Sequence, residues 1–561
     1  MIPVRKSVGP ALAALALLSI QTTGGPLGGT GAEPSSGDPE LGRRIYREGR
    51  LPSGAEVQAE LGSVRVSGDA FTCAACHRPS GYGSEEGATP VPPITGEALL
   101  APRRLDRAEG FRRLYQENQS DPFYARVRDP RLRPGYDLDA LDTALRTGRD
   151  PAGRILDPWM PRYAFQRDDL EHLAAYLRTL GDGPDPGVEL RRIHLATVIG
   201  PGVDDRRSRA MLDVMDAFIQ RRNLEMEGLR ARPGHSPNHR ADFAATWRDW
   251  KLHVWRLRGP PESWGSQIRD AYRRQPVFAL LGGLAEGSWR PIHEQCEALQ
   301  LPCLFPNTDL PVADSDAGDS TLYLSRGLVG EAEALARHLQ KHRPDARVLQ
   351  VHNEAPRSVA GAEALAHALG DRVETLALES PVDDRTWHRL TAAASPPAPS
   401  PPAQVLVAWL WDSGLAQRPL PEDSPIDTVV LSGGLLGTAP TRTSPALSGR
   451  VLLTWPFAMP DRSIPRSYRV RAWLRSRGLH ADDERLQLDT YFTLSVADHA
   501  MRHLVTRFDR RLLIERIEHE TENTLSPGVY PRLSLGPGQR FASKVCRVVS
   551  LSDGGALTLA P

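Results

Sequence analysis

The most constraining feature of this sequence is a pair of cysteines followed at once by a histidine, in the stretch Cys73-Ala74-Ala75-Cys76-His77. The chain has only five cysteines in 561 residues, so this local pairing is a strong signal. Two thiols at this spacing can add to the two vinyl groups of haem, and the adjacent imidazole can ligate the iron from one side. The pattern therefore predicts one covalently attached haem c, with Cys73, Cys76 and His77 as its binding residues.

Three other chemistries use two cysteines at this spacing. A structural zinc site needs a second pair of ligands, and the sequence has no other C-x-x-C. A redox pair of the thioredoxin kind expects a strand–helix–strand context, which is absent here. A plain disulfide stays open as an alternative. Because the haem motif occurs once, the sequence also argues against the two-haem peroxidases.

The N-terminus has the pattern of an export signal. Arg5 and Lys6 precede an apolar run over 11–20, and small residues at 30–32 offer a cleavage site. We expect residues 1–32 to be a signal peptide that is removed. The mature protein is then expected to be soluble in the periplasm, with no transmembrane segment. An uncleaved N-terminal anchor is the alternative.

Charge and motif content narrow the function further. Lys plus Arg equals Asp plus Glu at 69 each, so nothing points to nucleic acid as a partner. The sequence has no Walker loop, no H-E-x-x-H, no G-x-S-x-G and no G-x-G-x-x-G. Whether the chain is an enzyme stays open, and a non-catalytic electron carrier is favoured.

In an exported protein, Cys296 and Cys303 are expected to form a disulfide.

Met160 is the candidate for the second axial ligand of the haem iron. It lies between Trp159 and Pro161, which restrict the chain to a non-helical turn, and a helix with an apolar face over 170–177 follows. Cytochromes c often use a methionine opposite the histidine. The alternative is a loop methionine that fills a gap in the core. In that case His172 is the nearest replacement as a ligand.

Further features flank the haem motif. A helix is expected over 40–49, and a Pro-rich turn over 90–99 offers a backbone carbonyl that could orient His77. Together with the haem motif and the Met-Pro loop, these features resemble class I c-type cytochromes over about residues 38–182. The resemblance implies a small all-α cytochrome c domain that transfers electrons. Two long insertions, one before the haem motif and one after Gly96, depart from small cytochromes.

The larger remainder of the chain has a different pattern. A Gly- and Pro-rich stretch, with its linker placed at 183–190, separates it from the first domain. Strands then alternate with helices over 191–309 and again over 346–457, and the chain ends in long helices and a hairpin around 536–538. This order resembles type I periplasmic binding proteins, with the branched-chain amino-acid-binding branch the closest. The resemblance implies a two-lobe α/β module over 191–561, with a ligand between the lobes.

The same resemblance implies where ligand contacts would lie. The family places them on the turn after the third strand and on the loop after the fourth. In this sequence those positions are Gly283, Ser288, Asn307 and Thr308. Ser288 can equally be only the cap of the next helix, and Asn307 only a turn residue.

The combined expectation is a periplasmic mono-haem electron carrier fused to a solute-binding-protein-like module. That module would bind a small ligand or dock a redox partner such as a dehydrogenase or terminal oxidase. One alternative is a haem enzyme with an open iron site. Another is an ABC-transporter-type solute receptor in which the haem is accessory.

Overall fold

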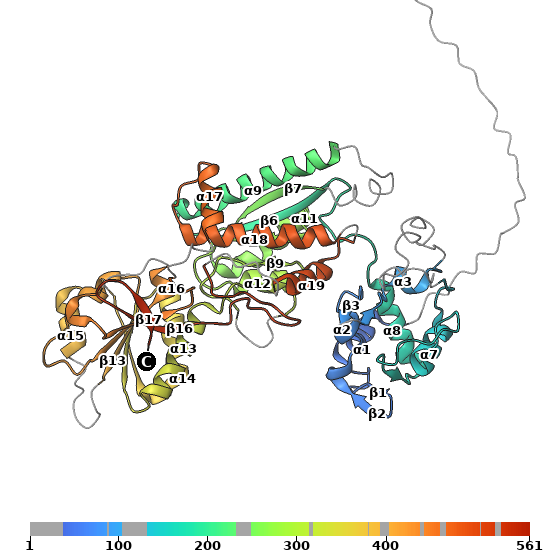
Figure 1. The fold of residues 1–561 in the computed structure, drawn as a ribbon, viewed down its shortest axis with the longest axis horizontal. Coiled ribbons are helices and arrows are strands. Elements are labelled where there is room, and N and C mark those ends of the chain that lie inside the picture. Colours follow the sequence, from blue (N-terminus) through green and yellow to red (C-terminus); the bar gives the residue numbers. More distant parts are fainter. Residues whose placement is uncertain are drawn as a thin grey trace, which may run out of the picture.

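The computed structural model describes most of the chain after the expected signal peptide. The described residues are 37–86, 89–103, 132–231, 248–312, 318–379, 381–392, 403–437, 443–460, 467–504, 507–521 and 529–560. The signal peptide at 1–32 and most of the insertion after Gly96 lie outside these ranges. Among the described helices, none combines the length and apolar character needed to cross a bilayer. Figure 1 shows three parts along the chain.

The first part is built from short helices and small antiparallel sheets. Its elements are α1 (Pro39–Glu48), β1 (Gln58–Leu61), β2 (Val64–Ser67), α2 (Cys73–His77), β3 (Ser84–Glu86), β4 (Thr89–Val91), α3 (Gly96–Leu100), α7 (Leu138–Thr147), β5 (Arg162–Tyr163) and α8 (Arg167–Thr179). The insertion before the haem motif forms the β1–β2 hairpin, which pairs with β5 in the order β2-β1-β5. The expected helix over 40–49 and the helix after Met160 are both present, as α1 and α8.

Helices α1 and α8 cross closely and anchor the core of this part. A side chain at Gly42 would collide with the backbone of His172, so only glycine permits this approach. The rings of Tyr46 and Tyr176 pack at 5.3 Å between centroids. The His172 ring accepts a hydrogen bond from the Asp38 N–H at 2.8 Å, at the start of α1. The crossing therefore fixes the two ends of the domain against each other.

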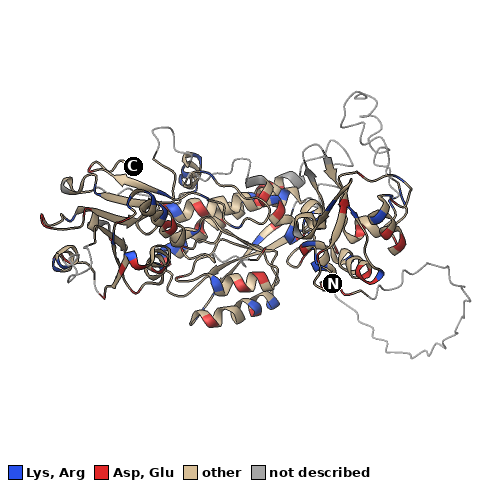
Figure 2. Cartoon of the chain, turned by 90° about the horizontal axis from the view of Figure 1, so that it is seen from below, with Lys and Arg blue, Asp and Glu red and all other residues tan. Residues whose placement is uncertain are grey.

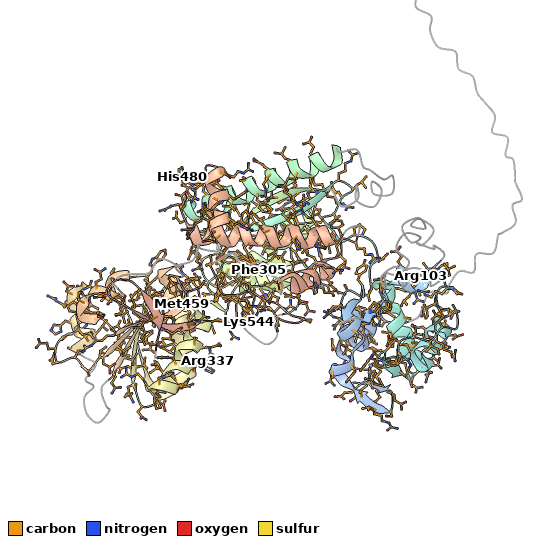
Figure 3. All side chains as sticks on the ribbon, in the orientation of Figure 1. Arg103, Phe305, Arg337, Met459, His480 and Lys544 are labelled. Atoms are coloured by element: carbon orange, nitrogen blue, oxygen red, sulfur yellow. The ribbon has the colours of Figure 1, made fainter. Side chains whose placement is uncertain are left out.

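The second part is a parallel α/β lobe, here called lobe 1. It contains β6 (Arg192–Ile199), α9 (Asp205–Ala231), β7 (Asp249–Arg256), α11 (Trp264–Arg274), β8 (Ala279–Leu281), α12 (Arg290–Ala298), β9 (Cys303–Leu304) and β10 (Thr321–Leu322). Its strands are parallel in the order β10-β9-β8-β6-β7. This is the doubly wound order in which the second strand lies outside the first. Phe305, labelled in Figure 3, is fully buried in this lobe and packs on Phe492.

The third part, lobe 2, repeats the same strand order. It contains α13 (Gly327–His342), β11 (Val348–His352), α14 (Pro356–Leu369), β12 (Val373–Ala377), α15 (Asp384–Ala392), β13 (Val405–Trp409), β14 (Thr428–Ser432), α16 (Gly433–Leu436), β15 (Val451–Trp455), β16 (Arg547–Leu551) and β17 (Leu557–Leu559). The sheet order is β12-β11-β13-β14-β15-β16-β17, with β16 and β17 antiparallel at one edge. The terminal hairpin is thus formed by β16 and β17. Around 536–538, the described strand pairing is the isolated antiparallel bridge Leu533–Ser543.

The chain passes between the two lobes more than once. It leaves lobe 1 after β10 and returns through α17 (Tyr468–Ser476) to α18 (Glu484–His503), which packs on α9. Helix α19 (Arg510–Thr521) follows, and the segment near Phe541 then runs beside Tyr323 before entering β16. Basic and acidic residues are interspersed along all three parts (Figure 2). The fold is therefore one small helical domain followed by two interleaved α/β lobes.

Cys296 and Cys303 are both buried and adjacent, but they are free thiols joined by a hydrogen bond, so the expected disulfide is not formed. The residues placed in the linker pack on lobe 1. The Asp185 N–H donates to the Phe508 carbonyl at 2.9 Å, and its carboxylate accepts from the Arg510 N–H at 2.6 Å. The domain boundary at 183–190 stays a prediction.

Candidate functional site

The C-x-x-C-H stretch forms a single helical turn, α2. The Thr72 hydroxyl caps this turn by accepting a hydrogen bond from the Ala75 N–H at 3.1 Å. Neither cysteine forms a disulfide within the described residues; Cys73 is partly buried and Cys76 is exposed. His77 follows on the same turn and is buried. The sequence thus places two thiols and one imidazole on one short, capped element.

The His77 ring is held in one orientation by the Pro-rich turn. Its Nδ1 lies 2.9 Å from the carbonyl oxygen of Pro92. Because a carbonyl only accepts, Nδ1 carries the proton and Nε2 keeps its lone pair, which is the state that a metal ligand needs. Burial lowers the pKa of His77, although the hydrogen bond to Pro92 opposes this, so the neutral ring is favoured. The expected role of the 90–99 turn in orienting His77 is confirmed.

Met160 lies in a tight turn before β5. Its N–H donates to the Asp157 carbonyl at 3.1 Å, and the Trp159 N–H donates to the Asp157 carboxylate at 2.9 Å. The Met160 side chain is partly buried and packs against the cluster that also contacts Cys73. Trp159 points outward and is 74% exposed. Asp157, which the sequence pattern did not single out, therefore helps to fix this turn.

These residues fit a covalently bound haem. Cys73 and Met160 pack against one apolar cluster, and Cys76 and His77, with its available Nε2, lie on the same turn as Cys73. The rival zinc site would need more ligands, and the described part of the chain holds no group of three His, Cys, Asp or Glu side chains able to bind a metal ion. His172, the alternative ligand, is instead engaged by the Asp38 N–H. The assignment of Met160 as the second ligand stays a prediction.

The four residues expected between the lobes lie at the carboxyl ends of the lobe 1 strands, but they make local contacts. The Ser288 hydroxyl accepts from the Arg290 N–H at 3.2 Å, and the Thr308 hydroxyl accepts from the Leu310 N–H at 3.0 Å. The Gly283 carbonyl accepts from the Asn307 N–H at 3.0 Å. The side-chain oxygen of Asn307 is buried and has no partner within the described residues. Of the four, Asn307 alone therefore has an unsatisfied polar atom.

A group of charged residues, missed by the sequence analysis, links the two lobes at this edge. Arg357, at the start of α14 in lobe 2, lies 3.4 Å from Asp309 and 3.9 Å from Glu286, both of lobe 1. Arg485 of α18 lies 2.8 Å from Asp309 and donates to the Gly434 carbonyl of lobe 2 at 3.2 Å. Burial works against the charged form of Asp309, but Arg485 and Arg357 hold its pKa below the usual value.

A buried acid adjoins this network. Burial raises the pKa of Asp489 to about 7, although nearby Arg485 opposes the shift. One of its carboxyl oxygens has no partner among the described residues. No sequence pattern marked these charges, because they come from loops and helices far apart in the chain.

The chain combines a small domain that contains the haem motif with a two-lobe α/β module. Residues 67–181 match the family model for cytochrome c. No curated protein matches the chain. The predicted order, a cytochrome c domain followed by a two-lobe α/β module, is therefore confirmed.

Solved structures similar to this chain include proteins of ABC transporters. One is a branched-chain amino acid ABC transporter protein from Thermus thermophilus with bound valine, at 12% identity and TM-score 0.46, covering 67% of this chain and 96% of that chain. Another is a leucine binding protein from Thermotoga maritima, at 15% identity and TM-score 0.43, covering 66% and 98%. A fatty acid ABC transporter substrate-binding protein from Thermomonospora curvata shares 14% identity at TM-score 0.43, covering 67% and 93%. The fold itself rests on the strand orders and lobe crossings described above.

Proposed function

We propose that the chain is an exported, periplasmic electron carrier that holds a single haem c through Cys73, Cys76, His77 and Met160. The observation that supports this best is the His77 ring, whose Nδ1 is bound to the Pro92 carbonyl so that Nε2 is free. A covalently bound haem supplies one-electron transfer through its iron. The protein residues would hold and orient this group.

The two proposed axial ligands decide between electron transfer and catalysis. His77 is buried and fixed, and Met160 is held in a turn by Asp157. When both sides of the iron are ligated, no open coordination position remains for oxygen or peroxide. The arrangement therefore favours a carrier over the haem-enzyme alternative.

The exposed side of the haem motif is the proposed contact for a redox partner. Cys76 is exposed, Phe71 is 37% exposed and Trp159 is 74% exposed. Phe71 and Trp159 are neighbours in sequence of Cys73 and Met160, so they flank the haem-binding residues. A periplasmic dehydrogenase or terminal oxidase is the class of partner that we propose for this surface.

The carrier function is tested by optical spectroscopy and carbon monoxide binding. We expect the reduced wild-type holoprotein to show a six-coordinate, low-spin spectrum that does not change when carbon monoxide is added. Both ligand positions are then filled by protein side chains. Rapid binding of carbon monoxide by the wild-type protein would contradict the electron-carrier function and support the haem-enzyme alternative.

For the two-lobe module we propose that a small ligand binds at the edge lined by Asn307, Asp309, Arg357 and Arg485. The unsatisfied Asn307 oxygen and the ion pairs across the lobes support this location. A charged ligand can form ion pairs with these residues in place of the ion pairs between the lobes. The competing proposal, a module that only docks a redox partner, is supported by the same ion pairs, since they already close the lobes.

A thermal-shift screen of the full-length holoprotein separates these two proposals. Amino acids, short carboxylates and fatty acids form the panel. A ligand at 100 times its Kd adds about 2.7 kcal/mol to the unfolding free energy, so the melting temperature rises. We expect Asp309→Asn to abolish that rise, whereas Glu363→Gln, an exposed change on α14, leaves it intact. A panel without any shift favours the docking role.

A further inference from the structure

Helix α19 of the two-lobe module lies against the segment that follows His77 (Figure 1). The Glu515 carboxylate accepts two hydrogen bonds from Ser80, one from its backbone N–H at 2.7 Å and one from its hydroxyl at 2.6 Å. Ser80 is completely buried. The two residues are 435 positions apart in the sequence, so these bonds join the two domains directly.

Other contacts surround this pair and exclude water from it. Tyr82 packs against the core cluster of the two-lobe module, and the Arg507 guanidinium lies 5.2 Å from the centre of its ring. Arg511 of α19 donates to the Tyr176 hydroxyl of α8 at 3.1 Å. Arg47 of α1 forms an ion pair with Asp319. The interface therefore involves α1, α8 and the segment after the haem motif.

The segment that Glu515 contacts is under backbone strain. Arg78 directly follows His77 and has a φ of +64°, in the left-handed region that costs a non-glycine residue energy. Its carbonyl accepts from the Tyr46 hydroxyl at 2.7 Å. The His77 carbonyl accepts from the Gly83 N–H at 3.0 Å, which closes the loop over Ser80. Such a conformation persists only when its surroundings hold it.

We propose that Glu515 is a positioning residue for the haem-binding segment, acting from the two-lobe module through Ser80 on the loop after His77. This inference rests on the proposed role of the first domain as a haem electron carrier. It makes the module part of the haem environment. The haem potential should then depend on the charge and hydrogen bonding of a residue outside the cytochrome domain.

The charged and titratable groups around Glu515 come from both domains. They are Arg511 and Glu518 on its own helix, Asp509 directly before that helix, Tyr46 and Tyr176 on the cytochrome helices, and Arg78, which acts on Glu518. Burial raises the pKa of Glu515 to about 7, while the hydrogen bonds from Ser80 oppose the shift. Glu515 therefore changes charge near neutral pH, and its negative charge favours the oxidised, more positive state of the bound haem.

The first test measures hydrogen exchange at the Ser80 amide in the full-length holoprotein. We expect Glu515→Gln to speed this exchange by about tenfold or more, because the amide loses a charged acceptor. Glu363→Gln removes an exposed carboxylate from lobe 2 and should leave the rate unchanged. A wild-type rate at Ser80 in Glu515→Gln would overturn the proposal. This arm is independent of the electron-carrier function.

The second test measures the midpoint potential against pH, a property that a purely structural contact would not change in this way. At about pH 8.5 wild-type Glu515 is ionised, so we expect Glu515→Gln to have the higher potential. At about pH 5.5 the two proteins should converge, because Glu515 is then protonated. A difference that is equal at both pH values, or no difference at all, would overturn the proposal.

A double-mutant cycle with Ser80→Ala covers the case in which Glu515→Gln is less stable than the wild type. The effects of the two substitutions on thermal unfolding should be non-additive, because the side chains share a hydrogen bond. Strict additivity would show that the pair does not interact in solution. Binding of carbon monoxide by the wild-type protein would contradict the electron-carrier function. The hydrogen-exchange and unfolding results would still test the role of Glu515.

Discussion

A double variant, Cys73→Ala with Cys76→Ala, is expected to show no haem stain on its protein band after denaturing gel electrophoresis, whereas the wild-type band stains fully. The stain survives denaturation only if haem is joined by covalent bonds, and these two thiols lie on the same capped turn as His77. Thioether bonds are irreversible under these conditions, so the expected effect is complete loss. Expression must take place in a host that attaches haem to exported proteins.

Cys546→Ala is the matched control for this experiment. Cys546 is a partly buried free thiol at the edge of lobe 2, far along the chain from the haem motif. Its removal should leave the stain unchanged. Stain retained by the double variant would mean that haem is attached elsewhere, and the prediction that residues 73–77 bind haem would then be wrong.

The substitution Met160→Ala is expected to keep the covalent haem but to change its electronic state. The ferric form should lose its methionine-to-iron charge-transfer band, and the reduced form should gain the ability to bind carbon monoxide. A thioether favours ferrous iron, so the midpoint potential should fall by a sizeable part of the roughly 0.8 V that axial ligands span. Optical spectra and a redox titration measure these changes.

Met459→Ala is the control for the loss of a methionine side chain. Met459 lies in the two-lobe module and is partly buried there (Figure 3). Its substitution should leave the spectrum and potential of the haem unchanged. A ferric spectrum of Met160→Ala identical to that of the wild type would transfer the second axial position to another residue.

The local parts of this structure could be predicted from the sequence because their signals are local. The haem motif, the turn that orients His77 and the flanking helices α1 and α8 each follow from residues within a few positions of one another. The alternation of strands and helices likewise indicated two α/β lobes, since helices and buried strands differ in hydrophobic period.

Contacts between distant segments could not be predicted in this way. The Glu515–Ser80 pair and the Arg357–Asp309 pair join elements whose meeting depends on the whole topology. A single sequence contains no signal that two such residues are neighbours. The expected disulfide failed for a different reason: Cys296 and Cys303 are buried next to each other, but an S–S bond needs oxidation of the thiols as well as proximity.

The separation of 435 residues between Ser80 and Glu515 also has a consequence for the order of events during biogenesis. If the chain crosses the membrane N-terminus first, the haem motif reaches the periplasm long before α19 does. Until then the loop after His77 lacks its acceptor, and the face that α19 later covers stays open to the attachment machinery. If haem is attached to the exported chain, as the proposed function requires, its insertion can take place before the last part of the chain arrives and the two domains dock.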